Sequence, residues 1–167
     1  MNGARNPLCV RLAIAARLLL AVLGFLPALV LDGCAQVDSP LPQMALPIDY
    51  RDTFVPVRNC RLGNAHPQQV VVRARPETAP LYDMGPYPYP VGTVIALEQY
   101  RDSACTDLTG YLVMRKEAAG WDPASGDWHW FTLDPQKSVQ EEGHLTTCAG
   151  CHTAMCPDHD RTCGDKL

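Results

Sequence analysis

The sequence predicts an α+β fold that is mainly an antiparallel β-sheet, with a few short helices and a cysteine-rich motif on a C-terminal helix. Four segments are rich in β-branched and aromatic residues, which favour strands. Turn-forming residues separate these segments, as expected between antiparallel neighbours. Helix-start signals are concentrated after the last of them. The four segments are residues 69–75, 92–100, 108–117 and 128–133.

The N-terminus is typical of an export signal. An apolar run over residues 18–31 follows three arginines and precedes small residues, so residues 1–34 are predicted to be a secretory signal. The run is shorter than the roughly 20 residues that span a bilayer. Residues 31–34 resemble a bacterial lipobox with Cys34 as the lipidated residue; cleavage after Ala35 and an uncleaved anchor are the alternatives. Each predicts an exported bacterial protein, in the periplasm or on the extracytoplasmic surface of a membrane.

The chain after this leader is long enough for one domain. Three prolines indicate an extended linker over residues 35–47. We expect a single domain over residues 48–155 and a cysteine-containing tail over residues 156–167. The whole chain has a formal net charge of −4 at pH 7. Cleavage of the leader would remove three arginines and make the net charge of the mature protein more negative. An acidic surface argues against a nucleic-acid partner, because phosphates require basic residues.

The elements around the first predicted strand are short. Residues 48–58 favour a helix that Pro56 would interrupt or end. Pro76 ends the strand, and one helical turn is expected over residues 77–82. The loop over residues 84–90 contains three prolines, which exclude regular structure there.

The last two predicted strands form a hairpin, because residues 122–127 have the composition of a turn. Asp and Pro at the start of residues 134–143 are typical of a helix N-terminus, and a glycine ends that segment. We therefore expect a helix there. Thr146 or Thr147 is expected to cap one more helix.

That last helix would carry Cys148, Cys151 and His152, in the run Cys-Ala-Gly-Cys-His. Cys-x-x-Cys-His is the attachment signature of c-type haem, in which the two thiols add to the haem vinyl groups and the histidine ligates the iron. On a helix, the two sulfurs lie about one turn apart and the histidine follows them closely. The sequence therefore predicts one covalent haem c.

The other cysteines leave alternatives open. Cys156, His159 and Cys163 bring further zinc-ligand types close to the motif, so a zinc site is the main alternative and a redox dithiol a weaker one. Free thiols are disfavoured in exported proteins. Four cysteines remain outside the leader and the haem motif, and this even number suggests two disulfides. The simplest pairing joins Cys60 to Cys105 and Cys156 to Cys163, although the sequence does not fix it.

Five stretches of the sequence are informative when taken together: Tyr50-Arg51, Tyr89 to Ile95, Leu108 to Lys116, Gly126 to Trp128, and Cys148 to His152. Together they resemble the cytochrome P460 family, which includes the cytochromes c′-beta. The resemblance covers about residues 48–155. It implies an antiparallel β-sheet domain, often a homodimer, that holds one haem with a proximal histidine and an open or apolar distal face. Members oxidise hydroxylamine or bind nitric oxide and related small ligands.

The resemblance also implies roles on the distal side of the haem. In the branch with hydroxylamine chemistry, a lysine is linked to the macrocycle at a position that corresponds here to Leu97, which cannot form the link. Lys116, on the next strand, is the nearest amine. The distal carboxylate of that branch corresponds to a place near Arg115, with Glu117 on the same strand face. The distal candidates are therefore Leu97, Arg115 and Glu117.

The function depends on the sixth position of the iron. Thr93, Ile95 and Leu97 share one strand face and would form an aliphatic pocket, which favours five-coordinate iron. We expect a cytochrome that binds small ligands such as nitric oxide, or oxidises small nitrogen compounds such as hydroxylamine, together with a redox partner protein. A non-catalytic electron carrier with a protein sixth ligand is the alternative. Candidate sixth ligands are Met84, Met114, Met155, His66, His129 and His144.

Overall fold

The computed structural model describes residues 44–164. The predicted signal with Cys34, most of the predicted linker and the last three residues lie outside the described residues. In the part of the chain that is described, no helix has the length and apolar character needed to cross a membrane.

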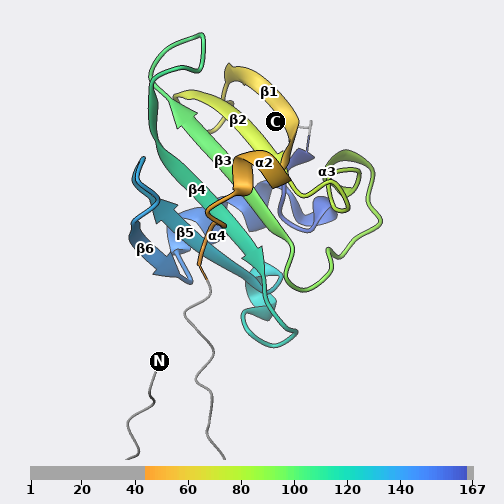
Figure 1. The fold of residues 1–167 in the computed structure, drawn as a ribbon. Coiled ribbons are helices and arrows are strands. Elements are labelled where there is room, and N and C mark those ends of the chain that lie inside the picture. Colours follow the sequence, from red (N-terminus) through yellow and green to blue (C-terminus); the bar gives the residue numbers. More distant parts are fainter. Residues whose placement is uncertain (1–43, 165–167) are drawn as a thin grey trace, which may run out of the picture. The chain divides into compact units, whose positions relative to one another are not determined.

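Six strands form one antiparallel sheet in which neighbours along the chain are also neighbours in space (Figure 1). The α+β prediction is confirmed, and the four predicted strands are β2 to β5. The strands are β1 (Val55–Leu62), β2 (Gln69–Ala74), β3 (Val94–Tyr100), β4 (Leu108–Lys116), β5 (Trp128–Leu133) and β6 (Val139–Gly143).

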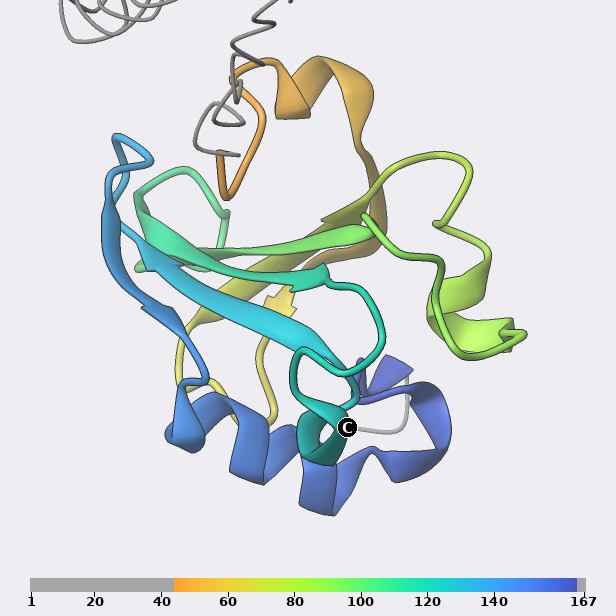
Figure 2. The same cartoon turned by 90° about the horizontal axis from the view of Figure 1, so that it is seen from below.

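The helices are short and lie on both sides of this sheet. Helix α2 (Tyr50–Thr53) lies on one side and α4 (Thr146–Met155) on the other, as Figure 2 shows. The remaining helices are α3 (Leu81–Met84) and the 3-10 helices η1 (Pro123–Ser125) and η2 (Pro157–His159). The sheet therefore separates two layers, of which only the layer with α4 carries the Cys-x-x-Cys-His run.

The prediction of a helix over residues 134–143 is wrong. The Asp134 carboxylate accepts hydrogen bonds from the backbone N–H groups of Gln136 and Ser138, both at 2.9 Å, and so closes a tight turn. Lys137 takes a left-handed conformation in this turn, with φ of 67°. The chain then reverses into β6, which pairs with β5. Asp134, which the sequence suggested as a helix N-cap, instead stabilises the turn between β5 and β6.

The predicted helix over residues 48–58 is also shorter than expected. It ends at Thr53, and Val55 begins β1, an edge strand of the sheet. Pro56 is tolerated there because an edge strand need not donate every backbone N–H.

Both faces of the sheet are apolar, because side chains alternate along each strand. On the α2 side, Ala96 and Val113 are buried together with Ala45 and Leu46. The last residues of the predicted linker are thus part of the core instead. On the α4 side, the buried cluster contains Val72, Tyr82, Tyr89, Ile95, Met114, Trp128, Trp130 and Ala149.

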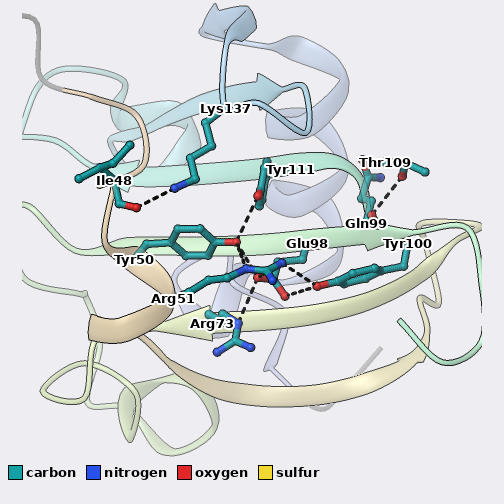
Figure 3. Close-up of polar contacts among 10 residues, drawn as sticks. All are labelled: Ile48, Tyr50, Arg51, Arg73, Glu98, Gln99, Tyr100, Thr109, Tyr111 and Lys137. Carbon is teal, nitrogen blue, oxygen red and sulfur yellow. Dashed lines mark hydrogen bonds and ion pairs between the residues drawn. The ribbon is translucent and has the colours of Figure 1, made fainter. Parts of the chain in front are cut away.

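Glu98 is fully buried on the α2 side, and its carboxylate is satisfied by surrounding donors (Figure 3). The hydroxyls of Tyr50 and Tyr100 each donate to it at 2.8 Å. Arg73 Nε lies 3.2 Å and Arg51 3.3 Å from Glu98 Oε1. Burial, reinforced by the hydrogen bond to Glu98, raises the pKa of Tyr100 to about 12, so this hydroxyl keeps its proton. The cluster joins α2 to β2 and β3.

We expect Glu98→Gln to lower the free energy of unfolding by about 1–3 kcal/mol, because an amide presents a donor where the tyrosines and arginines need an acceptor. The effect stays moderate because Arg51 is half exposed and can be hydrated. Urea unfolding followed by fluorescence measures it. The matched control is Glu141→Gln on an exposed position of β6, which should stay within about 0.5 kcal/mol of the wild type. Equal stability of the two variants would contradict this role of Glu98.

Candidate haem site

Helix α4 brings the three residues of the predicted motif to one cavity. Cys148, Cys151 and His152 all line a cavity of about 300 Å³ between α4 and the sheet. Leu145, and not a threonine, occupies the N-cap position of this helix, without a side-chain cap. The helix is nevertheless in place, because Ala149 and the half-buried Cys148 pack against the core on this side of the sheet.

The wall that β2, β3 and β4 contribute to this cavity is mainly aliphatic, and Arg58 of β1, with Trp130 and Phe131 of β5, completes the lining from the sheet. Leu97 and Ile95 lie on the same face of β3 and both line the cavity. Leu97 pairs with Leu112 across the strands, and Ile95 pairs with Met114, so all four side chains point the same way. Val70 and Val72 of β2 extend this wall. Such a surface admits small uncharged molecules and disfavours charged ones.

The two motif cysteines carry free thiols, whereas the other cysteines in the described part are paired. The disulfides Cys60–Cys105 and Cys156–Cys163 are present, which confirms the predicted pairing. Burial raises the pKa of the Cys148 thiol, so this group is mainly protonated at neutral pH. A redox dithiol reacts as a thiolate, so that alternative loses support. The zinc alternative loses support because Cys156 and Cys163, two of its candidate ligands, are joined to each other. Within residues 44–164, no group of three or more His, Cys, Asp or Glu side chains is arranged to hold a metal ion.

His152 is held in the tautomer that an axial iron ligand requires. Its Nδ1 lies 2.5 Å from the backbone carbonyl oxygen of Arg161, and because a carbonyl only accepts, Nδ1 carries the proton. The lone pair is therefore on Nε2. Burial lowers the pKa of His152, which keeps the ring neutral. Trp130 meets the imidazole edge-to-face, with 4.8 Å between the ring centroids. A neutral imidazole with a free Nε2 is a metal ligand.

A buried ion pair fixes the loop that supplies the Arg161 carbonyl. Lys116 Nζ lies 2.8 and 2.7 Å from the two carboxylate oxygens of Asp160 and 2.7 Å from the carbonyl oxygen of Gly126. Both side chains are buried. Trp128 Nε1 donates to the Asp160 carbonyl at 2.7 Å. Lys116, which the sequence offered as the nearest amine for a haem link, instead binds Asp160. Nothing in the sequence pattern marked Asp160, which lies 44 residues away from Lys116.

Arg115 and Glu117 lie on the other side of the sheet and do not line the cavity. Arg115 pairs with Val94, whose side chain belongs to the α2-side core. Its Nε lies 2.7 Å from Glu117 Oε1, and its guanidinium lies 5.1 Å from the centre of the Phe131 ring. The structure therefore separates these two distal candidates from Leu97.

The structure brings two of the six candidate sixth ligands to the cavity. Met114 is buried in the aliphatic wall, and His66 reaches the cavity from the loop between β1 and β2. The other four lie elsewhere: Met84 and Met155 are exposed, and the rings of His129 and His144 stack on Trp121.

The family model for cytochrome P460 matches residues 47–161 of the chain. The chain belongs to the cytochrome P460 family. It is therefore a c-type cytochrome with haem as its cofactor, and the matched region includes all six strands, α4 and the Arg161 carbonyl. No curated protein matches the chain.

The residues at the cavity fit the haem of a P460-family cytochrome. Its donor set is two free thiols and a neutral histidine with Nε2 available, all on one helix and all facing one apolar cavity. These are the groups that thioether attachment and axial ligation of a haem c need. The same set would be incomplete for zinc, which takes four ligands in structural sites.

Proposed function

We propose that this member of the cytochrome P460 family is an extracytoplasmic monohaem cytochrome c that binds small ligands such as nitric oxide at an open iron position. Cys148 and Cys151 would hold the haem by thioether bonds, and His152 would ligate its iron. When bound, the haem supplies an iron centre that can take a diatomic ligand and exchange one electron. The observation that carries the proposal is the fixed Nδ1–H tautomer of His152 beside an aliphatic cavity wall.

The side chains around the cavity act by exclusion and by orientation. The aliphatic wall keeps water and ions away, which favours uncharged ligands. The Arg161 carbonyl accepts the Nδ1 proton of His152, and this hydrogen bond increases the basicity of Nε2 and fixes the ring. Leu97 in the wall supports ligand binding over hydroxylamine oxidation, because leucine supplies no amine for a macrocycle link.

The extracytoplasmic location is supported by the two disulfides. Disulfides form and persist in oxidising compartments and are rare in the cytosol. In bacteria, haem c is also attached outside the cytoplasm. The cofactor and the disulfides therefore both favour an extracytoplasmic compartment.

An absorption spectrum of the ferrous protein tests this function. We expect a high-spin spectrum that shifts when carbon monoxide or nitric oxide is added, because the proposal leaves the sixth position open to such ligands. A low-spin spectrum that does not change with either gas would contradict the proposed ligand-binding function and would support an electron carrier. Met114→Leu is the informative variant for that second function, because Met114 is the methionine that lines the cavity. If Met114 were a ligand, this variant alone would convert a low-spin spectrum to high-spin.

A further inference from the structure

His66 reaches the same cavity as His152 but from a different element. The loop between β1 and β2 extends from the sheet toward α4, as Figure 2 shows, and its residues 63–66 line the cavity. Within residues 44–164, His66 and His152 are the two histidines that line this cavity. The aliphatic wall of Val70, Leu97 and their neighbours lies beside them.

The backbone of the loop holds His66 in place. Gly63 N–H donates to the carbonyl of Gln68 at 2.9 Å, and Gln68 N–H donates to the carbonyl of His66 at 2.7 Å. A Cβ at Gly63 would lie 2.6 Å from the His66 carbonyl oxygen and 3.2 Å from its Cβ, so the tight path of the loop requires glycine. The position of His66 at the cavity is therefore built into the fold of the loop.

The imidazole of His66 can donate a hydrogen bond to a molecule in the cavity. Its ring is partly buried and lines the cavity, and an imidazole carries at least one N–H in either protonation state. The part of the cavity formed by β2, β3 and β4 is apolar, so a donor beside it has a large effect on a bound polar ligand. Arg58 and Asn64 also line the cavity, so loss of His66 should weaken that hydrogen bonding without removing every donor.

We propose that His66 is the distal residue of the haem site, whose N–H hydrogen-bonds a small ligand held at the iron and slows its release. The proposal deepens the proposed function and rests on it. It makes His66, in place of Arg115, the group that distinguishes polar diatomic ligands from apolar ones. The aliphatic wall selects for size and lack of charge, and His66 selects for a hydrogen-bond acceptor.

The test compares three variants of the full-length haem protein. His66→Leu removes the donor and keeps much of the bulk, His66→Gln keeps a donor, and His144→Gln is the matched control, because His144 is half exposed and stacks on Trp121 away from the cavity. The C–O stretching frequency of the ferrous carbon monoxide complex and the dissociation rate of oxygen or nitric oxide are measured. We expect His66→Leu to raise the stretching frequency and to speed dissociation roughly two- to tenfold, the range of one hydrogen bond. His66→Gln should recover much of the difference.

One result would overturn the proposal while leaving the proposed function intact. It is a His66→Leu variant that matches the wild type and His144→Gln both in the C–O stretching frequency and in the dissociation rate of oxygen or nitric oxide. A wild-type spectrum that is low-spin and becomes high-spin in His66→Leu would make His66 an iron ligand, and it would overturn this proposal together with the open iron position of the proposed function. A wild-type protein without haem, or one whose haem ignores carbon monoxide in every variant, would instead refute the proposed function.

Discussion

Replacing both Cys148 and Cys151 by serine is expected to abolish covalent haem attachment. A serine hydroxyl does not add to a haem vinyl group, and within residues 44–164 these are the two free cysteines, so no other thiol there can substitute. Haem staining after denaturing electrophoresis measures the result, because only covalently attached haem stays with the polypeptide. Single replacements should leave one thioether bond and reduced yield.

The matched control for this experiment is the double variant Cys60→Ser with Cys105→Ser. It also removes two sulfurs, but from a disulfide whose residues do not line the haem cavity. We expect this control to keep its haem and to lose about 2–4 kcal/mol of stability, since the disulfide closes a loop with a sequence separation of 45 residues. Haem that survives denaturation in the Cys148 and Cys151 variant would contradict the assignment.

Asp160→Ala is expected to destabilise the protein by about 3–5 kcal/mol. The substitution leaves the buried Lys116 ammonium without its carboxylate, and an uncompensated buried charge is among the most costly defects. It also removes the acceptor of the Tyr89 backbone N–H, which lies 2.8 Å from Asp160 Oδ2. Urea unfolding of the haem protein measures the loss.

Two further variants separate the ion pair from a general effect on the loop. Asp158→Ala removes an exposed carboxylate from the same loop and should stay within about 0.5 kcal/mol of the wild type. Adding Lys116→Met to Asp160→Ala should recover part of the stability, because no unpaired charge remains buried. If Asp160→Ala unfolded at the same urea concentration as Asp158→Ala, the ion pair would not anchor the loop that positions Arg161 and His152.

The sheet could be predicted from the sequence because its strands are continuous β-branched and aromatic runs. The exceptions have local causes. β6 was missed because Asp134 can cap either a helix or a turn, and which one forms depends on the pairing of the following residues with β5. Residues 45 and 46 resemble a linker in composition, yet they are buried because the sheet offers them an apolar face.

The motif residues of the site and Leu97 in the cavity wall could also be predicted, but the positions of Arg115 and Glu117 could not. Alternation along β4 correctly puts Arg115 and Glu117 on one face, but it does not say which face meets the cavity. That choice is made by the register of β3 with β4, in which Leu97 faces Leu112 and Arg115 faces Val94. His66 depends on the path of a loop, and Asp160 on a contact over 44 residues, and neither leaves a periodic signal in the sequence.

The most direct test of the account is the intact mass and the pyridine haemochrome spectrum of the wild-type protein, purified from cells that mature c-type cytochromes. We predict a mass that exceeds the polypeptide by one haem, persists after denaturation, and comes with a spectrum typical of two saturated vinyl groups. Such a result is expected if Cys148 and Cys151 are both thioether-bonded. A colourless protein with the mass of the bare polypeptide would contradict the account.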